Sequence, residues 1–194
     1  MNYIQSIEKG LKERRSHREI VRKIFLSFPT KVFIGNEERQ FTIIDNIAFY
    51  FQIPLNSVQI VGSAKTGRSF HKNSTFNSQN SDLDVAIIDS SLFLKYSEYV
   101  FNQTKGFRDR SDFPIRDGRS TYEEYRQYLA RGIFRPDLMP TGKKRANWNK
   151  FFGKLSSKNK DMFKSINAGI YFSEMFFEYK QTKVIENYLN NRPI

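Results

Sequence analysis

The chain has 194 residues, no cysteine, and 32 Lys and Arg against 20 Asp and Glu, which gives a net charge of +12. The absence of cysteine excludes disulfides, cysteine-zinc sites and thiol catalysis. With only two histidines, His17 and His71, neither a His-rich metal site nor a Ser/His/Asp triad is expected. The length suits one domain that buries a core without covalent staples. The positive charge favours a polyanionic partner, although it also serves solubility.

No targeting segment is predicted. Residues 1–22 are charged throughout and contain no apolar h-region, which argues against a secretory signal. The longest apolar stretch, 43–51, is interrupted by Asp45 and Asn46 and is far shorter than a membrane span. We therefore expect a cytoplasmic protein without membrane insertion.

Residues 1–54 are predicted to form two helices. The spacing of apolar residues predicts the first over 2–27, ending before Pro29. The second is predicted over 36–52, with Asn36 as its N-cap. Its buried stripe is expected to consist of Phe41, Ile44, Ile47 and Phe51.

Residues 55–104 are predicted to contain two strands separated by a polar loop and followed by a helix. The strands are expected at 57–61 and 83–88, the loop at 72–81, and the helix at 90–103, with Ser90 or Ser91 as its cap. His71 is expected in an exposed loop, and His17 on a helix surface.

Residues 105–160 are predicted to form a basic helical insertion. They hold 15 Lys and Arg against six Asp and Glu, so they carry +9 of the net charge. Thr121 and Glu124 have capping-box spacing and predict a helix that ends near Gly132. Interleaved aromatic residues favour two interpretations equally: a nucleic-acid surface, or a solvated basic surface over an aromatic core. These aromatic residues are Phe107, Phe113, Tyr122, Tyr125, Tyr128, Phe134, Trp148, Phe151 and Phe152.

Residues 161–194 complete what we expect to be a single domain, 1–194. Periodicity alone does not decide whether 166–177 forms a third strand or a buried helix. A helix is predicted over 178–190. The aromatic residues here are expected to belong to the core: Tyr171, Phe172, Phe176, Phe177 and Tyr179.

Two carboxylates, Asp82 and Asp84, precede and enter the second strand. Alternation along a strand turns both to one face, about 7 Å apart, with Leu83, Val85 and Ile87 on the other. Two like charges at that distance favour a cation between them. Mg²⁺ prefers carboxylate oxygens and substrate phosphates, so the pattern predicts a metal–nucleotide site. The alternative is a solvated strand edge carrying two surface acids.

The first strand runs directly into Gly62 and Ser63. A strand that ends here and turns into a helix presents backbone N–H groups to an anion. Gly62 permits close approach of a phosphate, and the Ser63 hydroxyl can donate to it. Lys65 and Arg68 follow and are candidates to neutralise a triphosphate, with solvated surface charge as the alternative.

Together, Gly62, Ser63, Asp82 and Asp84 resemble the motif of the nucleotidyltransferase superfamily whose reference member is DNA polymerase beta. The spacer is long, with 18 residues between Ser63 and Asp82. The resemblance implies an α/β (α+β) fold with a small mixed sheet flanked by helices, with helical additions at both ends. It also implies a third carboxylate on a later strand, which the sequence does not place.

The natural third strand contains no acid, so the third carboxylate is sought elsewhere. Asp137 is ranked first, although Pro136 before it suits a central strand poorly. Asp161, Glu174 and Glu178 are the other candidates.

The resemblance implies transfer of NMP or dNMP from a nucleoside triphosphate, such as ATP, to a hydroxyl of a nucleotide, an oligonucleotide or a protein. Mg²⁺ or Mn²⁺ held by Asp82 and Asp84 would be the cofactor. Small stand-alone bacterial members imply a role in antiphage defence or in a toxin–antitoxin pair with a protein partner. Hailong-type antiphage enzymes extend deoxyadenylate oligomers from a C-terminal tyrosine, which makes Tyr188 or Tyr179 a candidate primer.

Two other hypotheses stay open. A catalytically incomplete nucleotidyltransferase fold would bind nucleotide or nucleic acid through its basic surface, without turnover. A purely structural or partner-binding protein, such as an antitoxin, is the third hypothesis.

Overall fold

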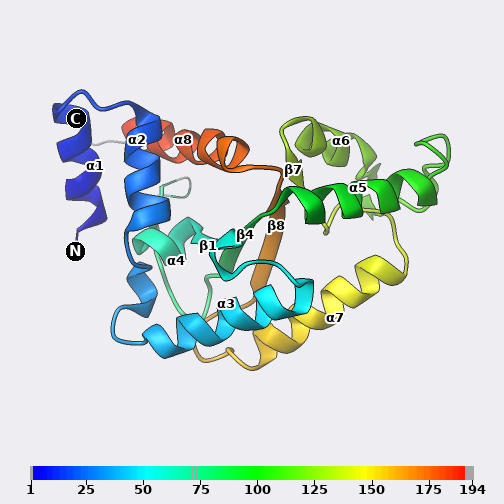
Figure 1. The fold of residues 1–194 in the computed structure, drawn as a ribbon, viewed down its shortest axis with the longest axis horizontal. Coiled ribbons are helices and arrows are strands. Elements are labelled where there is room, and N and C mark those ends of the chain that lie inside the picture. The colour runs from blue at the N-terminus through cyan, green and yellow to red at the C-terminus, as the bar shows by residue number, and fades with distance from the viewer. Residues whose placement is uncertain (1, 71, 73, 191–194) are drawn as a thin grey trace.

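A four-stranded mixed sheet lies at the centre of the computed structural model, which describes residues 2–70, 72 and 74–190 (Figure 1). Its strands, in spatial order, are β1 (Val58–Val61), β4 (Leu83–Ile88), β8 (Ile166–Tyr171) and β7 (Ile133–Phe134). The β4–β8 pair is parallel, and the β1–β4 and β7–β8 pairs are antiparallel. The protein is thus mixed α/β with a small mixed sheet, as the sequence predicts. His71 lies outside the described residues.

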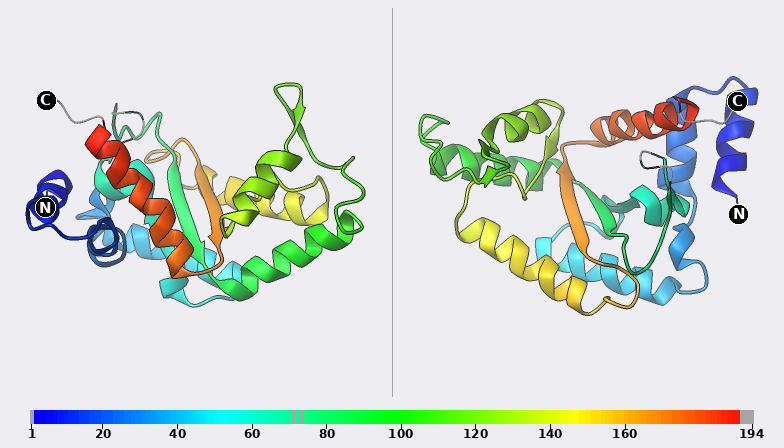
Figure 2. Two further views of the ribbon diagram at one scale, coloured as in Figure 1. Left: turned by 90° about the horizontal axis from the view of Figure 1, so that it is seen from above. Right: turned by 180° about the vertical axis from the view of Figure 1, so that it is seen from behind.

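Helices cover both faces of this sheet (Figures 1 and 2). One face packs on α3 (Glu37–Phe51), α5 (Ser90–Gln103), α6 (Tyr122–Ala130) and α7 (Lys143–Ser157). The other packs on α1 (Tyr3–Lys12), α2 (His17–Val21) and α8 (Glu174–Asn190). In the part of the chain that the structure describes, no helix has the length and apolar character needed to cross a bilayer.

Strand β4 forms as predicted, and its alternation divides the core. Leu83, Val85 and Ile87 are buried in the larger apolar cluster with α3, α5 and α7. Ala86 faces the smaller cluster beneath α8. Asp84 shares the face of Ala86 but remains accessible to solvent.

The predicted single helix over 2–27 is wrong. After α1 the chain turns through Arg14, whose φ is +56°, and α2 begins at a capping box between Ser16 and Glu19. The π-helical segment Arg22–Ser27 then continues α2. Gly10 lets α1 approach α2, since a β-carbon there would lie 2.8 Å from Ile20. A hydrophobic period continues across such a turn, so it did not reveal the break.

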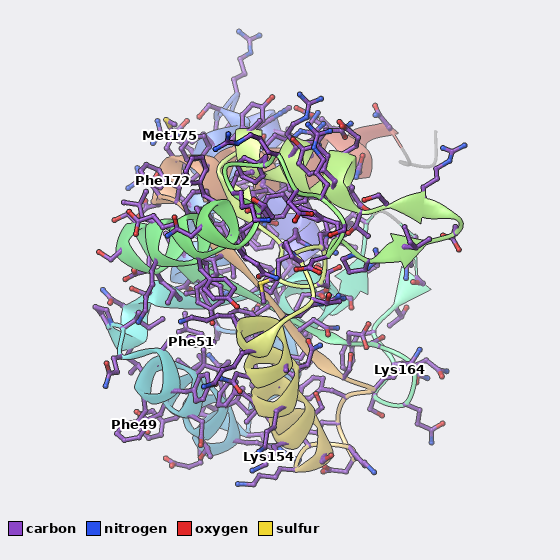
Figure 3. All side chains as sticks on the ribbon, turned by 90° about the vertical axis from the view of Figure 1, so that its right-hand side faces the viewer. Phe49, Phe51, Lys154, Lys164, Phe172 and Met175 are labelled. Atoms are coloured by element: carbon purple, nitrogen blue, oxygen red, sulfur yellow. The ribbon has the colours of Figure 1, made fainter. Side chains whose placement is uncertain are left out.

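Helix α3 has nearly the predicted bounds but a different buried stripe. Asn36 precedes it without a side-chain cap, and the buried residues are Ile43, Ile47 and Ala48. Of the predicted stripe, Phe41 is 52% exposed, whereas Ile44 and Phe51 are partly buried against the larger cluster. Figure 3 shows Phe49 at the outer margin, whereas Phe51 lies inward, its ring centroid 4.9 Å from that of Trp148. Of the four residues predicted for the buried stripe of α3, Ile47 is fully buried.

The segments around the motifs follow the prediction closely, with local differences. Helix α5 starts at Ser90, but its cap is Asp89, which accepts from the Leu92 N–H. A short strand within the predicted loop 72–81 pairs with another that precedes the loop, and the helix after β1 is a single turn. These elements are β2 (Arg68–Ser69), β3 (Ser74–Thr75) and α4 (Gly62–Thr66).

The basic stretch 105–160 contains the hairpin β5 (Ile115–Arg116) and β6 (Arg119–Ser120), then α6, β7 and α7. Thr121 occupies the N-cap position of α6, but its hydroxyl donates to the Leu138 carbonyl and makes no capping hydrogen bond. Of the two interpretations left open for the aromatic residues of this stretch, burial favours an aromatic core: Phe113, Tyr125, Phe134, Trp148 and Phe152 are buried.

Residues 166–171 form strand β8, which settles the alternative left open by periodicity. Helix α8 then begins at Glu174, four residues earlier than predicted. Tyr171 and Phe177 are buried as expected, but Tyr179 is 63% exposed on the outer side of α8.

Candidate functional site

Asp84 lies where two cavities meet at the edge of the sheet. One cavity, the sheet cleft, has a volume of about 740 Å³ and is lined by β4, β8, α7 and α8. The other, the serine pocket, has a volume of about 570 Å³ and is lined by Ser63, Arg68, Lys72 and Asp82. Gly62 and Asp84 line both cavities. A ligand can therefore contact the Asp84 carboxylate from two sides.

Two features of position 62 favour glycine: the backbone conformation and the closeness of the Asp84 side chain. Its φ is +66°, a left-handed conformation that favours glycine. A β-carbon at this position would lie 2.5 Å from Oδ2 of Asp84. The contact follows from sheet register, because Val61 pairs with Asp84 at the end of β1. The two predicted motifs are thus in direct contact.

The carboxylate of Asp84 is electrostatically strained. Burial within the cleft walls and the like charge of Asp82 raise its pKa to about 6, although Arg135 and Lys72 oppose the shift. The oxygens stay accessible to solvent at the concave surface. A cation bound beside them would relieve both the desolvation and the repulsion.

Ser165 and Asn167 complete the polar edge, and the sequence prediction missed both. The Ser165 hydroxyl donates to Oδ1 of Asp82 at 2.7 Å, and the Asn167 amide donates to the Ser165 hydroxyl at 2.9 Å. In the parallel β4–β8 register, Asn167 stands opposite Asp84. These two residues approach the carboxylates only through the pairing of β4 with β8, which joins residues more than 80 positions apart. The sequence contains no local pattern that reveals this pairing.

Of the predicted phosphate-binding residues, Gly62, Ser63 and Arg68 lie together, but Lys65 does not. The Lys65 ammonium is buried and donates to the Phe28 carbonyl at 2.7 Å. Burial lowers its pKa to about 8. It lines a different cavity, beneath the N-terminal segment, because it follows Ser63 by two residues, about half a turn around α4. Its predicted contact with a triphosphate is therefore not supported. Lys72, from the intervening loop, lines the serine pocket instead.

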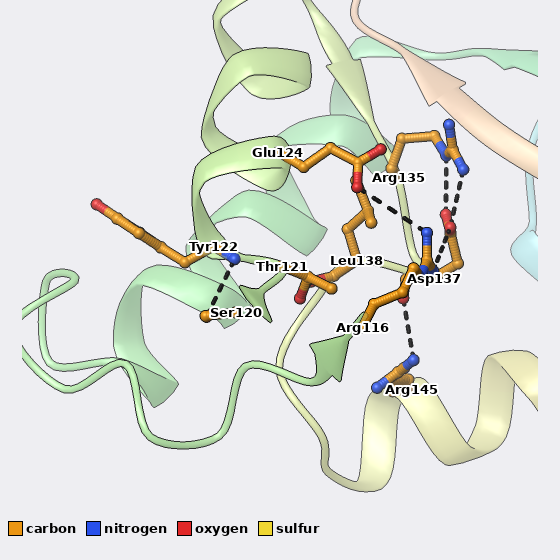
Figure 4. A network of polar contacts seen from close by, with 9 residues as sticks. All are labelled: Arg116, Ser120, Thr121, Tyr122, Glu124, Arg135, Asp137, Leu138 and Arg145. Carbon is orange, nitrogen blue, oxygen red and sulfur yellow. Dashed lines mark hydrogen bonds and ion pairs between the residues drawn. The ribbon is translucent and has the colours of Figure 1, made fainter. Parts of the chain in front are cut away.

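Asp137, the first-ranked third carboxylate, is engaged by arginines (Figure 4). Arg135 donates to its two carboxylate oxygens at 2.8 Å each, and Arg116 donates at 3.3 Å. Burial would raise the pKa of Asp137, but these arginines outweigh it and hold the pKa below its ordinary value. Asp137 lines the sheet cleft with Asp84. It nevertheless joins no metal-binding group, since no cluster of three or more His, Cys, Asp or Glu suited to a metal occurs among the described residues.

The other candidate carboxylates are also paired away from the site. Asp161 forms an ion pair with Arg39. Glu178 is buried and pairs with Arg18 and Arg22, and Arg22 also lies 3.9 Å from Glu174. No predicted third carboxylate reaches Asp82 and Asp84. The amide of Asn167 occupies the neighbouring position on β8 instead.

The two candidate primer tyrosines have different surroundings. The Tyr188 hydroxyl donates to Glu8, and its ring packs edge-on against Phe70. Tyr179 is exposed. Helix α8 contributes Val184 and Asn187 to the wall of the serine pocket, close in sequence to Tyr188.

None of the protein-family models, curated proteins and solved structures with which the chain was compared matches it. The family resemblance of Gly62, Ser63, Asp82 and Asp84 therefore remains a hypothesis. Its support is the chemistry of the site: two adjoining carboxylates, a glycine held against one of them, and a neighbouring pocket with hydroxyl and cationic side chains.

Proposed function

We propose that the protein is a metal-dependent nucleotidyltransferase that transfers NMP or dNMP from a nucleoside triphosphate to a hydroxyl acceptor. The observation that carries the proposal is the contact of Gly62 with Asp84, beside Asp82 and Ser63 in one pocket. A small mixed sheet with Gly62-Ser63 ending one strand and the carboxylates on its neighbour supports a polymerase-beta-like arrangement.

The residues at the site fit a hard divalent cation. Asp82 and Asp84 supply carboxylate oxygens, and burial with the like charge of Asp82 raises the pKa of Asp84 despite the nearby cations Arg135 and Lys72. Mg²⁺ commonly binds through one or two carboxylates together with substrate phosphates. When bound, Mg²⁺ or Mn²⁺ would neutralise the triphosphate and polarise its phosphorus–oxygen bonds.

The chain's own groups would orient the triphosphate. The Ser63 hydroxyl donates to a phosphate oxygen, and Arg68 and Lys72 place positive charge along the wall of the serine pocket. Gly62 presents no side chain, so phosphate reaches the carboxylate edge without a clash. An acceptor oxygen then bonds to the α-phosphorus as the bond to pyrophosphate breaks, and the hydroxyl proton passes to solvent.

A second candidate function is favoured by one observation. Asn167, not an acid, stands opposite Asp84, and no three-acid metal cluster exists among the described residues. A nucleotidyltransferase fold with this donor set would bind nucleotide or nucleic acid without turnover.

A panel of the eight common NTPs and dNTPs with Mg²⁺ or Mn²⁺, with products identified by mass, separates the two functions. We expect pyrophosphate release and an extended product, both abolished by Asp82→Asn with Asp84→Asn. The control, Asp45→Asn with Asp117→Asn, removes the same charge at exposed positions outside both cavities. Metal-dependent nucleotide binding without turnover by the wild type would establish the binding protein instead.

The same incubations test the primer hypothesis. If Tyr188 or Tyr179 accepts nucleotides, the intact protein gains the mass of whole nucleotide residues, and Tyr188→Phe or Tyr179→Phe abolishes the gain. A wild-type protein that turns over dATP while its own mass stays constant would exclude both tyrosines. The proposed role in antiphage defence or a toxin–antitoxin pair stays a prediction.

A further inference from the structure

The sheet cleft carries a second group of charges, none of which lines the serine pocket. Arg135, just after β7, and Lys180, on α8, both line the cleft with Asp84. Both also lie over the ring of Tyr128: the Arg135 Cζ is 4.9 Å and the Lys180 Nζ is 5.8 Å from the ring centroid. Two cations from distant segments thus meet at one aromatic side chain.

The Arg135 guanidinium is held in place. Asp137 receives two parallel hydrogen bonds from it, and the Asp137 backbone carbonyl accepts a further one from Arg145 at 2.9 Å (Figure 4). Arg116 shares the same carboxylate. Arg116 also lies 3.9 Å from Glu124. Two acids, Asp137 and Glu124, therefore stand against three arginines, so the cluster keeps a positive charge that faces the cleft through Arg135.

Lys180 adds to this charge without an acidic partner. Among the described residues, acidic side chains pair with Arg135 and with Lys183, but none pairs with Lys180. Burial and the like charges of Arg135, Arg131 and Lys183 lower the pKa of Lys180. Holding cations together in this way costs free energy that an anion in the cleft would recover.

We propose that Arg135 and Lys180 form an anion subsite that binds a phosphate group of an oligonucleotide strand. Resting on the proposed function, this strand is the acceptor: its phosphate is held at one end of the sheet cleft, and its terminal hydroxyl faces Asp84. The triphosphate occupies the serine pocket on the other side of Asp84. The two adjoining volumes, about 740 and 570 Å³, are each large enough for a nucleotide-sized ligand. Asp137 is then a positioning residue, which aims Arg135.

The choice of an oligonucleotide over a protein acceptor follows from the charge. A serine or tyrosine acceptor brings no obligatory anion, whereas every nucleotide of a strand brings a phosphate. Phosphates are bound by arginine and lysine side chains, and such contacts weaken as salt rises.

Binding of a fluorescein-labelled twelve-residue oligothymidylate, measured by anisotropy in EDTA without nucleotide, tests the subsite. We expect Lys180→Gln to weaken binding about fivefold, and Arg135→Gln with Lys180→Gln about 20-fold, with a shallower dependence on salt. Lys180→Gln breaks no ion pair, so it remains informative if the Arg135 variant fails to fold. Lys183→Gln, an exposed lysine one turn along α8, is the matched control and should change affinity less than twofold.

Equal losses in the Lys180 and Lys183 variants would overturn the subsite, since a diffuse surface field would then explain binding. Absence of oligothymidylate binding by the wild type would overturn it as well. The proposed function is judged separately, by Mn²⁺-dependent ATP binding and its loss in Asp82→Asn with Asp84→Asn. Oligothymidylate binding without metal is expected to survive in that variant, so either proposal can fail alone.

Discussion

Asp84 and Asp137 line the same cleft in opposite electrostatic surroundings. Asp84 lies beside another carboxylate, and burial and repulsion raise its pKa to about 6. Asp137 lies among arginines that hold its pKa below its ordinary value. Among the described residues, no cation forms an ion pair with the first carboxylate, whereas Arg135 and Arg116 pair with the second. A carboxylate in a cleft is therefore a candidate ligand for an external cation only where the protein has not supplied a cation itself.

The same distinction separates the two basic residues that follow Gly62. Lys65 is buried, and its ammonium is hydrogen-bonded to the Phe28 carbonyl. Arg68 lines the serine pocket with Asp82. Proximity in sequence to a phosphate-binding motif thus does not decide which cation faces the phosphate.

The largest expected effect distinguishes two single variants, Asp84→Asn and Asp137→Asn, each of which replaces a carboxylate with an amide. Asp84→Asn should weaken Mn²⁺–ATP binding about 100-fold or more, since loss of even an outer-shell partner of a metal costs 10–100-fold. Asp137→Asn should leave that affinity unchanged, because Asp137 contacts arginines and no other carboxylate. Isothermal titration with Mn²⁺ and ATP measures both. Equal losses would show that the distinction between Asp84 and Asp137 is wrong.

The next effect concerns stability and comes from Lys65. Its folded-state pKa is about 8 against 10.5 for the free side chain. Between these pH values the unfolded state binds more protons, so stability rises with pH across this window. The contribution amounts to about 2–3 kcal/mol and is absent below pH 8. Chemical denaturation of wild type and Lys65→Met from pH 7 to 10.5 isolates it as the difference between the two profiles.

Nucleotide binding provides the companion measurement for Lys65. Lys65→Met should bind Mn²⁺–ATP like the wild type, whereas Arg68→Met should bind it more weakly. Parallel pH profiles, or an affinity loss confined to Lys65→Met, would contradict the placement of Lys65 away from the site.

The sequence predicts well those features that are local. The alternation of Leu83, Val85 and Ile87 suffices for β4, and glycine and serine after a strand suffice for the turn at Gly62. The capping box at Ser16 and Glu19, although visible in the sequence, competes with a helical period that runs across it. Local patterns therefore identify elements better than the breaks between them.

The remaining site residues depend on long-range pairing. Asn167 reaches Asp84 only through the parallel register of β4 and β8, and Lys180 reaches Arg135 only because α8 crosses the sheet cleft. No spacing rule within the sequence expresses these two contacts. The error at Asp137 is local: its ion pair with Arg135, two residues before it, determines its role.

A smaller effect is expected from Gly62→Ala. The added methyl group would collide with Oδ2 of Asp84 and also strain the left-handed backbone. We expect about tenfold weaker Mn²⁺–ATP binding and destabilisation of about 1–2 kcal/mol. Gly35→Ala is the control: its φ is +82°, but nothing lies within 4 Å of the added carbon. It should share the strain and keep the affinity. Loss of affinity in both variants would assign the effect to backbone strain alone.

The smallest expected change in affinity comes from Asn167→Asp. This variant tests whether the cation site at Asp84 extends to β8. Neighbouring strands lie about 4.8 Å apart, so a carboxylate at 167 would join Asp84 across the β4–β8 pair. It adds a ligand but also repels the existing pair, which leaves a net gain of about fivefold in Mn²⁺ affinity without nucleotide. The metal-free variant should melt at a lower temperature than the wild type, and Mn²⁺ should raise its melting temperature more.

Asn149→Asp is the matched control for this last variant. It places the same charge in the same cleft. Asn149, however, lies on α7 and is not paired with Asp84 as Asn167 is. A gain restricted to Asn167→Asp, measured by titration with Mn²⁺ alone, would identify β8 as the third side of the cation site. A gain of equal size in both variants would instead reflect the charge of the cleft as a whole. Cation affinity would then depend on the total negative charge of the cleft and not on direct contact with Asp82 and Asp84. The difference in surroundings between Asp84 and Asp137 would not explain cation binding.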